Sequence, residues 1–235
     1  MIIAGWGNNN IIRSDFFYPK NEQEIIEILK KLNNEGIITR GLGRSYGDMS
    51  LYKNILSLEK YKKFFELDEK TGILRCSSNL SIVEIIEKIV NKGWFLNVTP
   101  GSKYVTIGGA IANDVHGKNH HKDGSFSDYV EEIKIITPDG KINICSNKSE
   151  YDLFKATCGG AGLTGVIVSA KLKLLKIKSK NLDVTIFKTK SIDETLKKFR
   201  ELNENKYLVA WLDTINKKNF GKAVIFSGDH SEDND

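Results

Sequence analysis

The sequence predicts an α+β fold, and three observations lead to this class. Amphipathic helices with recognisable N-terminal caps occur along the chain, and short apolar strands lie between them. Two of the strands flank the tight-turn tripeptide at 138–140, which predicts an antiparallel hairpin. Helices mixed with hairpins favour an α+β fold over a doubly wound parallel sheet.

Four helices are predicted where a capping pair precedes apolar residues at helical spacing. Gly36 and Gly93 end the first two, because glycine readily adopts the left-handed conformation that follows a helix. The third helix is short, and the fourth runs to about residue 204. The capping pairs are, in chain order, Asn21 with Glu24, Ser81 with Glu84, Ser149 with Asp152, and Ser191 with Glu194.

Apolar or alternating segments predict five strands in the first part of the chain, at 36–40, 72–78, 131–137, 141–146 and 165–177. The last of these starts as a buried run and then alternates, as a half-exposed strand does. Beyond residue 180 the predicted order is strand, helix, strand, strand, which indicates the start of a new sheet. These three strands lie at 182–188, 207–213 and 222–228.

The composition is that of a globular chain and excludes several classes of protein. The 235 residues allow one large domain, or one domain with part of a second, and 40% of them are hydrophobic. The net charge of +5 is modest and only five arginines are present, so we expect no nucleic-acid partner. No segment has the character of a signal peptide or a membrane-spanning helix, so we expect a cytoplasmic protein.

The three cysteines, Cys76, Cys145 and Cys158, lie far apart in the sequence and form no CxxC pair. This spacing argues against both a disulfide framework and a zinc ribbon. We therefore expect free thiols.

Two segments are unusually rich in glycine and other small residues. The first is 40–48, directly after a predicted strand, and the second begins at 100–102 and continues through 106–112. Successive backbone N–H groups in such loops form an anion-binding concavity suited to a pyrophosphate. A third short glycine segment lies at 159–162. Together the segments predict one extended ligand with phosphates, held by loops from two subdomains.

The common nucleotide-binding motifs do not fit these loops. Gly41 and Gly43 match the start of the GxGxxG fingerprint, but the third position is Tyr46 and no amphipathic helix follows. No GK[ST] sequence follows either loop, so a Walker-type phosphate loop is excluded.

The loops and their surroundings resemble a known family. The string RGLGRSYGD at 40–48 resembles the first pyrophosphate loop of the FAD-binding domain of the vanillyl-alcohol oxidase superfamily, the PCMH-type flavin fold. Residues 100–130 resemble the second loop and the segment under the flavin, 157–167 the strand on the adenine side, and 5–7 the start of the domain. Within this superfamily the string HGKNHH is most similar to the decaprenylphosphoryl-β-D-ribose 2′-oxidases of bacterial cell wall biosynthesis.

The resemblance implies a domain organisation. Residues 1–178 would form an FAD-binding PCMH-type domain of two subdomains, and residues 179–235 would begin an α+β substrate, or cap, domain. In this family a further part of the cap and a C-terminal FAD segment follow. We therefore expect an N-terminal fragment whose missing partner is the C-terminal half of the same enzyme.

The resemblance also implies the roles of particular residues. Tyr46 and Lys118 would face the substrate side of the flavin, and Trp211 would be a cap aromatic near the substrate. The catalytic candidates are Lys118, Tyr46 and His116. The first loop lacks the histidine that attaches the flavin in many relatives, so non-covalent FAD is expected. The cofactor-binding residues would be Arg40, Gly41, Leu42, Gly43, Arg44, Ser45, Tyr46, Gly47, Asp48, Gly101, Thr106, Ile107, Gly108, Gly109, Asn113, Asp114, His116 and Ile167.

Simpler interpretations stay open for three of these residues. Lys118 also fits a solvated surface lysine, and Tyr46 also fits packing within its loop. Asp48 fits a turn former, because aspartate side chains accept hydrogen bonds from nearby backbone N–H groups.

Three histidines, His116, His120 and His121, cluster in the second glycine-rich region. A metal site would need converging ligands, but Gly117 interrupts the helix that their spacing requires, and no Glu or Cys is close by. We predict no metal site. The flavin-lining role implied by the resemblance is assigned to His116, and the other two are expected to be structural loop residues.

The function implied by the resemblance is that of an FAD-dependent oxidoreductase. It would transfer a hydride from a secondary alcohol of a lipid-linked sugar, a polyprenyl-phosphate pentose, to flavin N5. A short-chain dehydrogenase partner would complete an epimerase pair, and the lipid would add peripheral membrane contact. The alternatives are an aldonolactone or alditol oxidase acting on a small sugar, and a truncated flavin-binding module without turnover.

Overall fold

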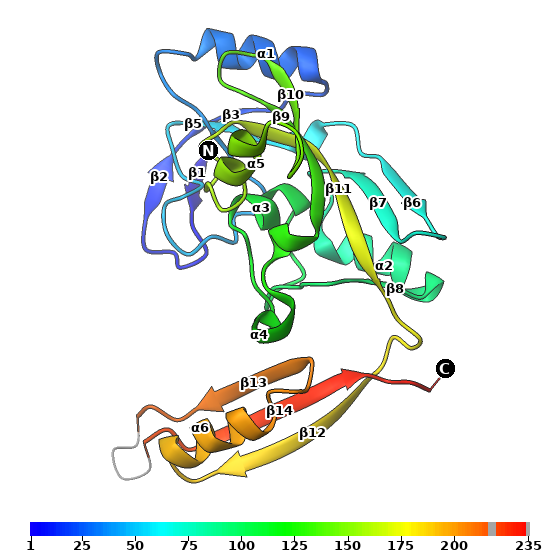
Figure 1. Cartoon of the computed structure of the whole chain (residues 1–235). Coiled ribbons are helices and arrows are strands. Elements are labelled where there is room, and N and C mark those ends of the chain that lie inside the picture. Colours follow the sequence, from blue (N-terminus) through cyan, green and yellow to red (C-terminus); the bar gives the residue numbers. More distant parts are fainter. Residues whose placement is uncertain (216–219, 234–235) are drawn as a thin grey trace.

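The structure is a computed structural model that describes residues 1–215 and 220–233 (Figure 1). Helices and strands are mixed along the chain, and most of the strand pairs are antiparallel, so the predicted α+β class is confirmed. The predicted cap segment 179–235 includes positions 216–219 and 234–235, which lie outside the described residues.

The largest sheet has the strand order β10-β9-β11-β7-β6, and β8 pairs with the far end of β11. Its centre is β11 (Val166–Lys176), whose 11 residues pair antiparallel with β7, β8 and β9. As predicted, β11 is first continuously buried and then alternates. The predicted hairpin is also confirmed, because β9 and β10 pair antiparallel across the turn. The other strands are β6 (Phe65–Asp68), β7 (Ile73–Ser77), β8 (Trp94–Leu96), β9 (Val130–Ile136) and β10 (Ile142–Cys145).

Two smaller sheets form the N-terminal region. One is the antiparallel hairpin of β1 (Ile2–Ala4) and β2 (Ile11–Arg13). The other is parallel, with the order β3-β5-β4, and the first glycine loop follows directly from β4. Its strands are too short to show an alternating pattern in the sequence, which explains why only β4 was predicted. They are β3 (Asp15–Phe17), β4 (Ile38–Thr39) and β5 (Asn54–Leu56).

The capping pairs predict three helix starts correctly. Asn21 caps α1 (Glu22–Lys31), Ser81 and Glu84 form a capping box on α2 (Ile82–Ile89), and Ser191 caps α6 (Ile192–Glu201). The end predicted for α6 near residue 204 is three residues too late, because the chain turns at 202–205. Short 3-10 helices lie at Leu58–Lys60, Val90–Lys92 and Phe126–Tyr129.

The cap predicted for α5 (Tyr151–Thr157) is wrong. The backbones of Ser146 and Ser149 form hydrogen bonds with each other in a tight turn. The N-cap position of α5 is instead Glu150, which has a φ of +49° and whose side chain makes no capping hydrogen bond. Two further helices were not predicted, α3 (Ile107–Ala112) in the second glycine-rich segment and α4 (His120–Asp123) in the histidine cluster.

The C-terminal sheet is separate from the sheets of the first part. It has the order β12-β14-β13 and carries α6 on one face. Its small core contains Leu208, Ala223 and Ile225, whereas the two core clusters of the first part draw on residues 25–174. The two parts therefore have separate hydrophobic cores. The strands are β12 (Leu182–Thr189), β13 (Tyr207–Leu212) and β14 (Ala223–His230).

All three cysteines are free, as predicted. Burial raises the pKa of Cys76 to about 12, of Cys145 to about 11 and of Cys158 to about 12. The thiols therefore stay protonated at neutral pH, and none of them is an activated nucleophile.

Candidate cofactor-binding site

A cavity of about 870 Å³ lies where the three predicted glycine segments meet. Its walls come from loops next to the N-terminal parallel sheet and the large antiparallel sheet, and include Thr39 of β4 and Ile167 of β11. The volume is within the range found for small-molecule and cofactor sites. The third glycine segment contributes Ala161 and Gly162 to the wall. The predicted cofactor residues that line the cavity are Arg40, Gly41, Leu42, Gly43, Arg44, Ser45, Tyr46, Gly101, Thr106, Gly108, Gly109, Asn113 and Ile167.

The backbone of the first glycine loop has unused hydrogen-bond donors. Among the described residues, none of the N–H groups from 41 to 47 donates a hydrogen bond to a protein acceptor. Six of these seven residues, 41–46, line the cavity. Such a run of free N–H groups is what an anionic group binds in a glycine-rich loop.

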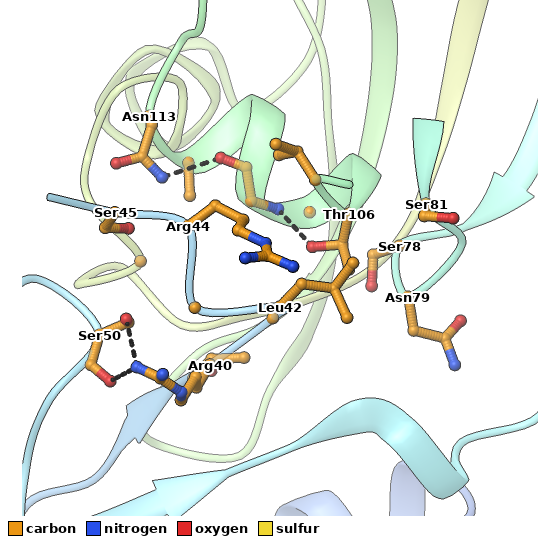
Figure 2. A pocket seen from close by; sticks show the side chains of 18 of the residues that line it. Arg40, Leu42, Arg44, Ser45, Ser50, Ser78, Asn79, Ser81, Thr106 and Asn113 are labelled. Atoms are coloured by element: carbon orange, nitrogen blue, oxygen red, sulfur yellow. Dashed lines mark hydrogen bonds between the residues drawn. The ribbon is translucent and has the colours of Figure 1, made fainter. Parts of the chain in front are cut away.

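Arg40 supports this loop from below. One guanidinium nitrogen donates to the Ser50 carbonyl and hydroxyl at 3.1 and 2.9 Å (Figure 2). The other donates to the Ala4 carbonyl at 2.7 Å. Gly43 has a φ of +65°, and a Cβ there would lie 2.2 Å from the guanidinium. Burial lowers the pKa of Arg40, and the hydrogen-bond acceptors found for it are all neutral. An anion bound nearby would offset the cost of this half-buried positive charge.

The N-terminal residues hold the other side of the loop. The Trp6 N–H donates to the Ser45 carbonyl at 2.8 Å, and the Arg44 guanidinium lies 4.6 Å from the centre of the Trp6 ring. A Cβ on Gly5 would approach the Gly47 carbonyl oxygen to 2.4 Å, so glycine is required at this close contact. In Figure 2 the Arg44 side chain extends between the loop and α3.

The second glycine segment differs from the first, because the N–H groups in the first turn of α3 already donate to acceptors within the protein. The Ile107 and Gly108 N–H groups donate to the carbonyls of Leu80 and Ser78, in the segment that precedes α2, and the Gly109 N–H donates to Thr106 Oγ1 at 3.1 Å. A Cβ on Gly41 would lie only 2.5 Å from the same Thr106 oxygen. The contact between the two loops thus depends on glycine in one and a capping threonine in the other. By contrast, a Cβ on Gly101 would meet nothing within 4 Å.

The far end of the cavity was not predicted from the sequence. It is lined by polar side chains from separate elements, and the Lys63 ammonium pairs there with the Glu84 carboxylate at 2.6 Å. These residues are distant in sequence and lie in no glycine-rich segment, so no local pattern identifies them. They include Ser57, Glu59, Lys63, Ser78, Asn79 and Glu84.

Several predicted site residues lie outside the cavity wall. Gly47 and Asp48 are exposed beside it, and the Asp48 carbonyl accepts a turn hydrogen bond from Leu51. Ile107 is fully buried in the core, with 0% exposure. His116 and Lys118 are exposed in the segment after α3, and Trp211 lies 74% exposed on β13.

Asp114 also lies outside the cavity wall, and both oxygens of its carboxylate accept hydrogen bonds from other residues of the protein. One oxygen accepts from the Ser127 N–H and hydroxyl at 2.9 and 2.5 Å, and the other accepts from the Ser125 hydroxyl at 2.9 Å. Its φ of +40° is unusual for a residue other than glycine. In this structure Asp114 fixes the segment that leaves α3 to the segment at 125–127.

The histidine cluster forms a row of edge-to-face rings. The ring centres of His116 and His120 are 5.5 Å apart, and those of His120 and His121 are 6.0 Å apart. The helix α4 begins after Gly117, so His116 is not part of it. Within residues 1–215 and 220–233, no three His, Cys, Asp or Glu side chains are arranged to hold a metal ion.

The fold thus places a cavity of about 870 Å³ between glycine-rich loops that lie next to the parallel sheet and the large antiparallel sheet. A family model for an FAD binding domain matches residues 15–146, which is more than half of the chain. The chain belongs to this family of FAD binding domains. The PCMH-type resemblance is thereby confirmed, and FAD is the cofactor of the domain.

Curated proteins extend the comparison. The chain is 30% identical to a decaprenylphosphoryl-β-D-ribose oxidase of Mycolicibacterium smegmatis, over 96% of this chain and 51% of the relative. It is 28% identical to a D-lactate dehydrogenase of Archaeoglobus fulgidus, over 66% of this chain and 37% of the relative. It is 26% identical to a D-arabinono-1,4-lactone oxidase of Candida glabrata, over 68% and 32% of the two chains. The chain thus spans about half the length, or less, of these relatives.

The described part of the chain contains no helix that is both long and apolar enough to cross a bilayer.

Proposed function

We propose that the chain binds FAD non-covalently in the cavity and forms the cofactor-binding part of an oxidoreductase. The observation that carries this proposal is the run of free backbone N–H groups in the first glycine loop, which line a cavity of about 870 Å³. These groups would hold the pyrophosphate, and the positive charge of Arg40 would strengthen its binding. Ile167, at the other wall, would lie by the adenosine. The loop contains no histidine, so no covalent attachment arises there.

When bound, the flavin supplies hydride acceptance from a carbon that carries a hydroxyl group. The protein's part is to position the alcohol and to take up its proton. Tyr46 is the catalytic candidate that lines the cavity, and it is 76% exposed there. His116 and Lys118 lie on the segment after α3, and Trp211 lies on β13. We assign these residues to the substrate side of the site.

For the substrate we propose the secondary alcohol of a polyprenyl-phosphate pentose. The relative named as a decaprenylphosphoryl-β-D-ribose oxidase supports this choice, because its similarity extends over 96% of the chain, including the segment after residue 178. A short-chain dehydrogenase would then act on the ketone product. A second candidate, an aldonolactone oxidase, is favoured by the similarity to a D-arabinono-1,4-lactone oxidase over 68% of the chain.

The first experiment tests cofactor binding by itself. The purified chain is mixed with FAD, separated from unbound ligand and examined by visible absorption and thermal unfolding. We expect a flavin band that co-elutes with the protein and is released on denaturation. A hundredfold excess of FAD over its Kd stabilises a protein by about 2.7 kcal/mol. A chain that folds cooperatively but retains no flavin and gains no stability would contradict the proposal.

The second experiment separates the candidate substrates. The FAD-loaded chain is mixed under anaerobic conditions with a polyprenylphosphoryl ribose or with an aldonolactone, and loss of flavin absorption is followed. Bleaching by the lipid-linked pentose alone supports the proposed substrate, and bleaching by the lactone alone supports the second candidate. Retained FAD without bleaching by either would indicate a binding module without turnover.

A further inference from the structure

The histidine motif contains a short helix that contacts the C-terminal sheet. Figure 1 shows α4 at the edge of the first part, next to β13. His121 Nε2 lies 3.1 Å from the Asn205 carbonyl oxygen, and because a carbonyl only accepts, this ring nitrogen carries the hydrogen. Just before the helix, the Lys118 carbonyl accepts from the Leu208 N–H at 2.9 Å. The segment from 118 to 123 therefore contacts residues 204–208, at and just before the start of β13.

The central contact is an ion pair shielded from water. The Lys206 ammonium lies 2.6 Å from Asp123 Oδ2, and only 19% and 18% of the two side chains are exposed. The neighbouring pair of Lys122 with Glu204, at 2.9 Å, has a glutamate that is 91% exposed. Exposed pairs of this kind contribute little, whereas removal of one partner from a shielded pair leaves an uncompensated charge.

The carboxylate of the shielded pair is held in place by further contacts. Asn119 is buried, and its amide donates to the same Asp123 oxygen at 2.6 Å and to the Asn97 carbonyl at 2.7 Å. A Cβ on Gly117 would lie 2.5 Å from the Asn119 side-chain oxygen, so glycine allows this amide to approach. The carboxylate is thus anchored to the first part of the protein before it meets Lys206.

Aromatic contacts continue the same interface. The Tyr207 hydroxyl and His230 Nε2 form a hydrogen bond of 3.0 Å within the C-terminal sheet, and burial raises the pKa of Tyr207. The His230 ring in turn lies edge-on to Phe95 of β8, with 5.3 Å between ring centres. The C-terminal sheet therefore contacts the first part through β13 and β14 together.

We propose that α4 docks the C-terminal sheet onto the FAD-binding part, and that Asp123 and Lys206 are the positioning residues of this contact. The role of His120 and His121 follows from it. Their rings connect His116, beside the cavity, to the backbone of Asn205. The motif HGKNHH thus joins the segment after α3 to the C-terminal sheet. The docking stands on contacts within the protein and does not depend on the proposed function.

Hydrogen exchange of the Leu208 amide measures this docking directly, because its acceptor lies across the contact on Lys118. In the full chain without FAD, Lys206→Met removes the charge but keeps the aliphatic stem. We expect exchange at Leu208 to rise by about tenfold or more, which corresponds to the loss of one strong contact. Amides in the centre of β11 should keep their wild-type rates.

Lys122→Met is the matched control, since it removes the same kind of side chain from the exposed pair of the same interface. It should change the Leu208 rate by less than about threefold. Lys206→Arg keeps the charge, so its Leu208 exchange rate should stay close to that of the wild type. Asp123→Asn should raise the Leu208 exchange rate as Lys206→Met does. Equal effects of Lys206→Met and Lys122→Met would overturn the proposal. So would an increase that extends equally to β11, because that result indicates general unfolding.

Discussion

At the scale of single residues, the contact between the two glycine loops depends on one missing Cβ. Gly41 approaches Thr106, whose hydroxyl oxygen is already held by the N–H of Gly109. Any side chain on Gly41 must push this oxygen away and so remove the cap of α3. A residue in the first loop therefore influences the conformation of the second, although sixty-odd positions separate them in the sequence.

Gly41→Ala tests this dependence. The new Cβ would lie 2.5 Å from Thr106 Oγ1, so the threonine must rotate or the loops must separate. We expect the free energy of unfolding to fall by about 1–2 kcal/mol, as for loss of a helix cap. FAD binding should weaken by about tenfold or more, since the loop that would hold the pyrophosphate moves. Thermal unfolding and fluorescence titration with FAD measure the two effects.

Gly47→Ala is the control in the same loop. A Cβ at Gly47 meets nothing within 4 Å, and neither Gly41 nor Gly47 has a positive φ. Stability should stay within about 0.5 kcal/mol of the wild type. If both alanine variants bind FAD equally well, the close contact of Gly41 with Thr106 does not shape the site.

At the scale of elements, the N-terminus of α2 makes the free energy of unfolding depend on pH. The Glu84 side chain completes the capping box with Ser81 and also pairs with Lys63. Burial alone would raise the pKa of Glu84, but the hydrogen bonds from Lys63 and Ser81 outweigh it and hold the pKa at about 2. Because the pKa in the folded state lies below its value in the unfolded chain, the ionised carboxylate stabilises the fold.

The sign of this effect predicts where the stabilisation disappears. It is fully present above the unfolded pKa of about 4.3, and it is lost as the pH falls towards the folded value. Glu84→Gln keeps a hydrogen-bonding side chain at this capping position but cannot ionise. The stability difference between the wild type and this variant should be constant from pH 5 to 8, and it should shrink below about pH 4. Urea unfolding across this range tests it, and a constant difference down to pH 2 would contradict the assignment.

The sequence predicts elements well where a local signal decides the structure. The caps of α1, α2 and α6 and the β9–β10 hairpin follow from side chains next to one another in the chain. α3 could not be predicted, because its segment contains two successive glycines and its first turn is fixed by carbonyls of Ser78 and Leu80. Ser149 failed as a cap because a competing turn uses its backbone.

The same distinction applies to the candidate site. The glycine loops could be identified because several small residues occur together, and 13 of the predicted cofactor residues line the cavity. The polar end of the cavity with Lys63 and Glu84 could not be identified from the sequence, since it forms only when elements distant in sequence pack together. The histidine pair was expected to be structural, and its contact with Asn205 becomes visible only when the C-terminal sheet is in place.

At the scale of the whole molecule, the protein consists of two cores joined by a largely polar contact. The core clusters of the first part and the small cluster around Ile225 share no residue. Between them lie the Asp123–Lys206 ion pair, two backbone-based hydrogen bonds and the edge-to-face contact of the His230 and Phe95 rings. Contacts of this kind between domains generally allow the parts to open separately.

This arrangement predicts two unfolding transitions that respond differently to FAD. The C-terminal sheet has three strands and a small core, so it should lose its structure at a lower urea concentration than the large sheet. All residues found to line the cavity lie between positions 6 and 167, so the proposed FAD site belongs to the first part. A hundredfold excess of FAD over its Kd should stabilise that part by about 2.7 kcal/mol and leave the earlier transition nearly unchanged. Hydrogen exchange of β14 and β9 amides across a urea series follows the two parts separately. One coincident transition that shifts as a whole with FAD would show instead that the docking at α4 is strong enough to make the molecule a single cooperative unit.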